Sequence, residues 1–96
     1  MTYKYVEGIL EKRTPFRAEH LALANDLRAE GKILCAGALS DATGAIFIFK
    51  GTQADALAFV EADPYVLNNL VPSYDLKEWM VGIGGDVLRA KESSDN

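Results

Sequence analysis

The sequence predicts an α+β protein of the ferredoxin-like type, with the split βαβ order βαββαβ and a four-stranded antiparallel sheet. Three observations lead to this class. Strand-like and helix-like segments alternate in that order, two apolar strands flank a tight turn mid-chain, and 96 residues suit one domain. We expect this single domain over residues 1–83, followed over 84–96 by a tail that is flexible or contacts a dimer partner.

The first part of the chain predicts a strand followed by a long helix. Residues 3–10 are rich in Tyr, Val and Ile, which favour strands. Thr14 offers an N-cap hydroxyl, and Pro15 suits the first helical position. We therefore expect a helix that begins here and ends at Gly31, a residue type common just after a helix.

A hairpin is predicted next. Residues 32–40 and 45–50 are apolar strand candidates, and Asp41-Ala42-Thr43-Gly44 between them is typical of a tight turn. Helices can cover only one face of a sheet, yet both of these strands are apolar on both faces. We therefore predict a homodimer in which two sheets face each other. In the first strand of this hairpin, alternation places Ile33, Cys35 and Leu39 on one face and Leu34, Ala36 and Ala38 on the other. In the second strand, it places Ala45, Phe47 and Phe49 on one face and Ile46 and Ile48 on the other.

The last part of the chain predicts a helix, a helical turn and a strand. Thr52 and Asp55 have capping-box spacing at the start of the helix. Pro64 disfavours helix at Asp63 and can itself begin a new turn with Asp63 as its N-cap. The final strand is expected over 74–82.

Composition argues against several functional classes. Fourteen acidic residues against ten basic ones, without a Lys/Arg cluster, make nucleic acid an unlikely partner. One cysteine and one histidine cannot form an internal disulfide or a Cys/His zinc site, so no metal or cofactor is expected, and Cys35 is expected to be buried. No apolar run approaches the roughly 18 residues of a membrane span, and no signal peptide is evident. We expect a cytoplasmic protein.

His20, the single histidine, is a candidate functional residue. It lies in an apolar stripe of the first predicted helix, so its imidazole needs a hydrogen-bond partner. A core histidine bonded to a backbone carbonyl is one interpretation, and a site residue is the other. Arg17, one turn earlier, can share a site with it.

Asp63 is the second candidate. Capping the turn at Pro64 explains this residue without any further role. The same carboxylate could also orient the imidazole of His20. Spacing alone leaves open whether residue 63 reaches the middle of the first helix.

The chain contains a set of segments in a recognisable order: Arg17-Ala18-Glu19-His20-Leu21, Gly31, Ala36-Gly37-Ala38-Leu39, Gly44, Ala62-Asp63-Pro64-Tyr65-Val66 and Trp79. Together these segments resemble the YCII-related family over about residues 3–81. The resemblance implies a dimeric α+β barrel fold and a His–Asp active site, here His20 and Asp63. It also implies lyase-type chemistry such as the elimination of HCl from chlorinated rings. One departure is Asn68-Asn69-Leu70, where the family often has Gly-Leu.

The leading functional hypothesis is a small-molecule enzyme of lyase or isomerase type. His20 would act as general acid/base, and Asp63 would orient its ring and stabilise its protonated form. Arg17 would hold an anionic substrate group, with Ser40 and Tyr65 as further substrate-binding candidates. The alternative is a non-catalytic dimeric module that binds a ligand or serves as an accessory subunit.

Overall fold

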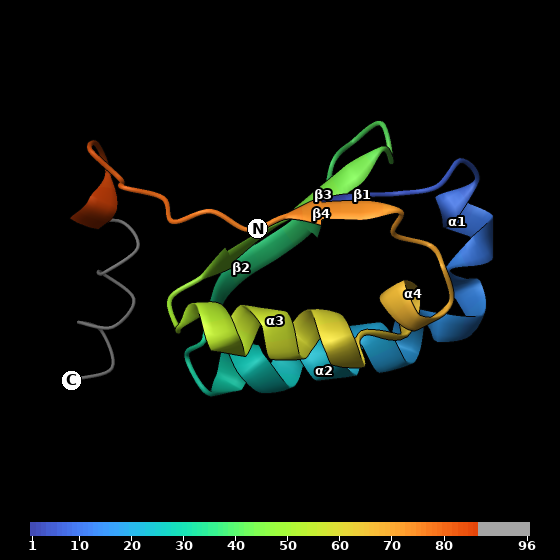
Figure 1. The fold of residues 1–96 in the computed structure, drawn as a ribbon, viewed down its shortest axis with the longest axis horizontal. Helices are drawn as coiled ribbons and strands as arrows, with labels where there is room; N and C mark the ends of the chain where they lie inside the picture. Colours follow the sequence, from blue (N-terminus) through green and yellow to red (C-terminus); the bar gives the residue numbers. More distant parts are fainter. Residues whose placement is uncertain (87–96) are drawn as a thin grey trace.

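The computed structural model describes residues 1–86, whose strands form one antiparallel sheet in the order β2-β3-β1-β4. Figure 1 shows α2 and α3 on the same side of this sheet. The predicted ferredoxin-like α+β arrangement is therefore confirmed. The strands are β1 (Thr2–Lys4), β2 (Ile33–Ala38), β3 (Gly44–Phe49) and β4 (Ser73–Asp75). The helices are α1 (Ile9–Lys12), the 3-10 turn η1 (Thr14–Phe16), α2 (Arg17–Ala29), α3 (Gln53–Ala62) and α4 (Pro64–Leu67).

The expected first strand, residues 3–10, was too long. β1 ends at Lys4, and Gly8 adopts a left-handed conformation, φ 79°, that starts α1. The expected cap at Thr14 was also wrong, because its hydroxyl donates to the Leu10 carbonyl instead of capping a helix. The end of α2 agrees with the prediction, since Gly31 follows it with φ 79°.

The expected last strand, residues 74–82, is also shorter, since β4 covers only Ser73–Asp75. The reason lies in the register, which pairs Asp75 with Thr2 of β1. Later residues therefore pass beyond Met1, where no described strand is present to pair with them. They form an extended segment in which Trp79 is 65% exposed. Of the tail expected over 84–96, residues 87–96 lie outside the described residues.

The faces of β2 differ from the predicted alternation because of a bulge. The register shifts between Ile33 and Cys35, so Ile33 pairs with Phe49 whereas Cys35 pairs with Ile48. Ile33 therefore shares the helix-covered face with Ala36, and Cys35 lies on the open face. Cys35 is consequently exposed, contrary to the expectation of a buried thiol.

The open face of the sheet is apolar on one half and polar on the other. Residues paired across neighbouring strands lie on the same face of the sheet. The open face, which the helices do not cover, is the one that carries Ile46 and the residues paired with it. The β2–β3 half carries Cys35, Gly37, Ile46 and Ile48, and the β1–β4 half carries Thr2, Lys4, Ser73 and Asp75.

The core lies between the sheet and the helices and is rich in aromatic rings. The ring of Tyr3 lies 4.7 Å from that of Phe47 and 6.4 Å from that of Phe59, centroid to centroid. Such pairs contribute about 0.5–1.5 kcal/mol beyond the burial of their surface. Tyr3 thereby joins β1 to β3 and α3. The other members of this cluster are Tyr5, Ile9, Ala45, Val60, Tyr65 and Leu70.

The helices of the described residues show two further features. The capping box at the start of α3 is formed, with the Thr52 hydroxyl accepting the Asp55 N–H and the Asp55 carboxylate accepting the Thr52 N–H. None of the helices within residues 1–86 is long and apolar enough to cross a membrane.

Candidate active site

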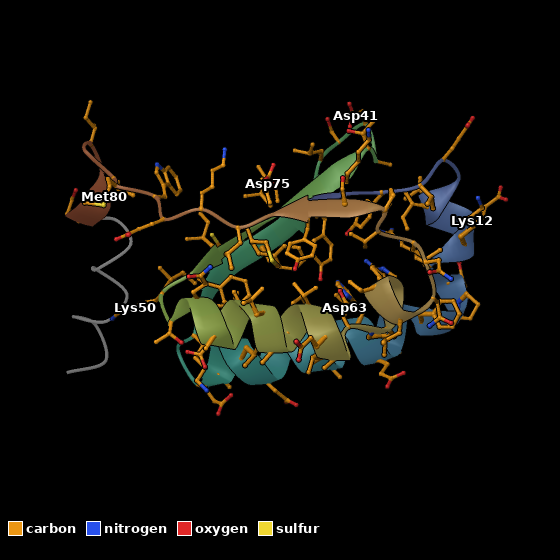
Figure 2. All side chains as sticks on the ribbon, in the orientation of Figure 1. Lys12, Asp41, Lys50, Asp63, Asp75 and Met80 are labelled. Atoms are coloured by element: carbon orange, nitrogen blue, oxygen red, sulfur yellow. The ribbon has the colours of Figure 1, made fainter. Side chains whose placement is uncertain are left out.

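Asp63 lies at the break between α3 and α4. Its backbone is extended, φ −67° and ψ 119°, because the following proline disfavours helical conformation there. Its carboxylate accepts the backbone N–H of Tyr65 at 3.0 Å and thereby caps α4, as predicted. In Figure 2 this residue lies where the two helices meet, beneath the sheet.

The same carboxylate also binds His20. Asp63 Oδ1 lies 2.7 Å from His20 Nδ1, and Asp63 Oδ2 accepts the hydroxyl of Tyr3 at 2.8 Å. Asp63 is 0% exposed and His20 only 7%. Such a buried carboxylate is tolerated because side chains and a backbone amide satisfy it. Capping and imidazole orientation therefore coexist, and the alternative of a histidine bonded to a backbone carbonyl is wrong.

The free nitrogen of His20 faces solvent. A carboxylate only accepts hydrogen bonds, so Nδ1 carries the proton and Nε2 of the neutral ring has the lone pair. No hydrogen bond in the described part of the chain uses Nε2. Every buried side-chain nitrogen or oxygen there has a partner, so Nε2 must be accessible. His20 therefore combines an anchored ring with a free proton acceptor.

Tyr65 fixes the plane of the imidazole. Its ring stacks on His20 with the centroids 3.8 Å apart and the planes inclined by 4°. Phe47 and Phe59 meet the same imidazole edge-on, at 6.3 and 6.0 Å. The ring is therefore confined by aromatic contacts as well as by Asp63.

A cavity of about 470 Å³ opens beside His20, between α2 and β2. On the helix side, its lining residues follow one face of α2 at spacings of three and four. On the strand side, the small residues of β2 leave space. The lining residues include Tyr5, Arg13, Arg17, His20, Leu21, Ala24, Arg28, Ala36, Gly37, Ala38 and Tyr65.

Two tyrosines of this cavity are neutral hydrogen-bonding groups at ordinary pH. Burial raises the pKa of Tyr5 to about 12, aided by the neighbouring Tyr65 and opposed by the positive charge of Arg13. Burial also raises the pKa of Tyr65, against the charges of Arg13 and Arg17. Neither hydroxyl bonds to another described residue, so both can serve a ligand.

The structure brings together four of the five predicted site residues. Arg17 and Tyr65 line the cavity with His20, and Asp63 lies behind the imidazole. Ser40 instead occupies the exposed turn between β2 and β3 and does not line this cavity.

Sequence reasoning missed Tyr3, Tyr5, Arg13 and Arg28. Helical periodicity could have predicted Arg28 as a residue of the site, because it lies on the same face of the helix as Arg17. The two tyrosines contributed only to the predicted first strand, and no local pattern distinguished Arg13.

A larger cavity, about 700 Å³, lies elsewhere and contains none of the predicted site residues. It is bounded by the start of α3 and by the extended segment after β4, including Trp79 and Met80. Size alone would favour it, but the imidazole–carboxylate pair lies with the smaller cavity. We therefore assign the candidate active site to the cavity beside His20.

Fold and site together define a class of ferredoxin-like α+β proteins with a buried His–Asp pair beside a cavity. The YCII-related domain model matches residues 1–80, and the chain belongs to this family. A solved structure with the same fold is 5-chloro-2-hydroxyhydroquinone dehydrochlorinase (TftG) from Burkholderia phenoliruptrix AC1100, in complex with 2,5-dihydroxybenzoquinone. It is 27% identical with a TM-score of 0.72, covering 84% of this chain and 91% of the other. A comparison with curated proteins gave no match.

Proposed function

We propose that the protein is a small-molecule enzyme in which His20 transfers a proton as general acid/base. The observation that carries this proposal is the bond between the buried Asp63 carboxylate and Nδ1 of His20, at 2.7 Å. This bond leaves Nε2 as the basic atom on the cavity side. Asp63 orients the ring and stabilises the imidazolium that forms when Nε2 takes a proton.

The proposed reaction begins with Nε2 of His20 taking a proton from a substrate carbon. The electron pair of the broken C–H bond then forms a double bond to the neighbouring carbon. In an elimination, that neighbouring carbon releases its leaving group as an anion, and the proton remains on Nε2 until it exchanges with water. Both carbons must be tetrahedral, so a hydroxylated aromatic chloride would react as its keto tautomer. In an isomerisation, the neighbouring carbon starts out doubly bonded to a third carbon; that double bond opens, and its electron pair takes the proton back from the imidazolium at the third carbon. Both reactions need only the His–Asp pair as the proton carrier.

The structural neighbour supports the elimination route. It is named a dehydrochlorinase, and removal of HCl is the loss of a proton and a chloride from one molecule. We propose that the present chain acts on a related class of small ring compounds, through His20 and Asp63. Arg17 and Tyr65 would contact the substrate. Ser40, outside the cavity, remains a weaker substrate-binding candidate that would need a longer substrate.

We also propose that the protein is a homodimer. The apolar half of the open sheet face, which includes Ile46 at 44% exposure, supports this assembly because a solvated face normally carries polar residues. A second copy is the simplest cover, since isologous dimers are the commonest assembly.

The test is turnover of 5-chloro-2-hydroxyhydroquinone and of related halogenated rings and lactones, followed by chloride release or absorbance. His20→Asn and Asp63→Asn should lower kcat by about 100-fold or more, the usual contribution of a general acid/base. Glu19→Gln, an exposed neighbour on α2, is the matched control and should retain activity. Folding of each variant is checked by circular dichroism.

The same experiment separates the enzyme from a ligand-binding module. Equal turnover by His20→Asn and the unmodified protein, on any substrate that is converted, would exclude the acid/base role. Binding of 2,5-dihydroxybenzoquinone without turnover of any compound would favour the non-catalytic alternative.

A further inference from the structure

The cavity beside His20 is positively charged within an acidic chain. The chain carries a formal charge of −4, yet Arg13, Arg17 and Arg28 line the cavity, and no aspartate or glutamate of the described residues does. Within residues 1–86, none of the three guanidinium groups has an ion-pair or hydrogen-bond partner. Their donors are therefore available to a ligand, and a guanidinium suits an anionic oxygen group.

Two of the three arginines lie at the catalytic end. Arg17 precedes His20 by one helical turn, about 4.5 Å along the axis, whereas Arg28 lies about 12 Å beyond His20. The charges of Arg13 and Arg17 both act on the hydroxyl of Tyr65, whose ring stacks on His20. Arg13 and Arg17 thus flank the same space as the imidazole, and Arg28 marks the distant end.

We propose that the His20 site takes a small planar anion, a single ring bearing a carboxylate or ionised hydroxyl that Arg13 and Arg17 hold. This inference rests on the proposed function, because it names the substrate class of the same site. Arg13 and Arg17 anchor the anionic oxygens, and the ring lies between α2 and the small residues of β2, within reach of Nε2. Ala36 and Ala38 line this side of the cavity with small side chains.

The hydroxyls of Tyr5 and Tyr65 complete this anion subsite. Both tyrosines remain protonated at neutral pH, so each can donate a hydrogen bond to an anionic oxygen. The negative charge of Asp63 also raises the pKa of both tyrosines, and the positive charges of Arg13 and Arg17 offset it at this end of the cavity. The Asp63 carboxylate is 0% exposed and is satisfied by Tyr3, His20 and the Tyr65 amide.

The test compares benzoate with benzamide, which have similar shape but differ in charge. Because the chain has one histidine, the His20 ring signal in NMR titrations reports binding at this site alone. Benzoate should shift this signal saturably and bind at least 10-fold more tightly than benzamide. Arg13→Gln and Arg17→Gln should each weaken benzoate about 10-fold or more, since a charged hydrogen bond is lost. Lys12→Gln removes one positive charge at an exposed residue outside the cavity; it is the matched control and should change affinity less than twofold.

Three results would overturn the inference: no benzoate binding, equal affinity for benzamide, or an effect of Lys12→Gln as large as that of Arg17→Gln. The last would indicate a diffuse positive field instead of a subsite. Failure of the proposed function is distinguishable, because Asp63→Asn leaves the arginines in place. Benzoate binding that survives in this variant, together with unchanged turnover, would reject the acid/base role and retain the anion subsite.

Discussion

The imidazole of His20 lies flat against the phenol ring of Tyr65, with the ring centroids 3.8 Å apart and the planes 4° from parallel. Two residues before this tyrosine, the backbone carries Asp63, which holds Nδ1 of the same imidazole. One short segment, from Asp63 to Tyr65, therefore sets both the rotation and the tilt of the ring. This is the relationship from which the site's behaviour can be predicted.

Replacing Tyr65 with leucine should free the imidazole. In the unmodified protein, the ring current of Tyr65 shifts the carbon-bound His20 protons upfield, and Tyr65→Leu should remove this shift. Tyr65→Phe retains the stack and is the control. NMR of the single histidine measures both variants, and an unchanged spectrum in Tyr65→Leu would contradict the stacked geometry.

The bond between Tyr3 and Asp63 should stabilise the fold measurably. Tyr3→Phe leaves one buried carboxylate oxygen without its hydroxyl partner, which should lower the free energy of unfolding by about 1–3 kcal/mol. Asp63→Asn should cost about 3 kcal/mol although asparagine still caps α4. Urea unfolding measures both. In a double-mutant cycle the two changes should couple by at least about 0.5 kcal/mol, and strict additivity would show that the bond contributes nothing.

Stability should fall at alkaline pH. Burial raises the pKa of Tyr5 to about 12 from its ordinary value of 10, so the unfolded chain loses this proton first. The resulting stabilisation is complete below pH 10 and is lost as the pH rises toward 12. Tyr5→Phe should flatten this decline in urea midpoints measured between pH 9 and pH 12. A decline as steep in Tyr5→Phe would assign the effect to other groups.

The open face of the sheet should mediate dimerisation. Sedimentation should give twice the mass of the 10.5 kDa chain at micromolar concentration, and Ile46→Glu should halve it. A charged side chain in the centre of an apolar interface is left without a partner. Leu67→Lys, at an exposed site on α4, is the control and should leave the mass unchanged. A single-chain mass for the unmodified protein would contradict the prediction.

Replacing Asn69 with glycine should destabilise the protein less than replacing it with alanine. Its φ of 61° is left-handed, a conformation that asparagine and glycine adopt at a lower cost than alanine. Asn69→Ala should lower the free energy of unfolding by about 1 kcal/mol, and Asn69→Gly should do so by less. Thermal unfolding distinguishes the two, and equal losses would indicate that the side chain matters more than the backbone.

Features that depend on neighbouring residues were predictable from the sequence. The capping box of Thr52 and Asp55 and the cap at Asp63 involve residues two or three positions apart, so propensity and spacing suffice. His20 was recognised because a polar group in an apolar helical stripe needs a partner. The element order followed in the same way from these local signals.

Features that depend on pairing between distant segments were not predictable. The bulge in β2 reversed the face of Cys35, because adding one residue to one strand changes the alternation that follows. The length of β4 was set by where β1 begins, which β4's own sequence does not encode. The identity of the partner of His20 depended on how far α4 lies from α2, and spacing along the chain carries no such distance.

The Asp63 carboxylate also ties chemistry to the completion of folding. The carboxylate bonds to His20 and to Tyr3, which lie 43 and 60 positions earlier in the sequence. These two hydrogen bonds therefore exist only after two long loops have closed. Contacts between residues far apart in the sequence form late in folding, because the entropy of closing the loop is lost before the contact can stabilise the chain. A nascent chain that ends within α3 contains His20 but lacks Asp63, the residue that orients it. In a fragment or a partly folded intermediate, the imidazole of His20 would therefore have no fixed orientation. The reactive geometry would form only together with the native state.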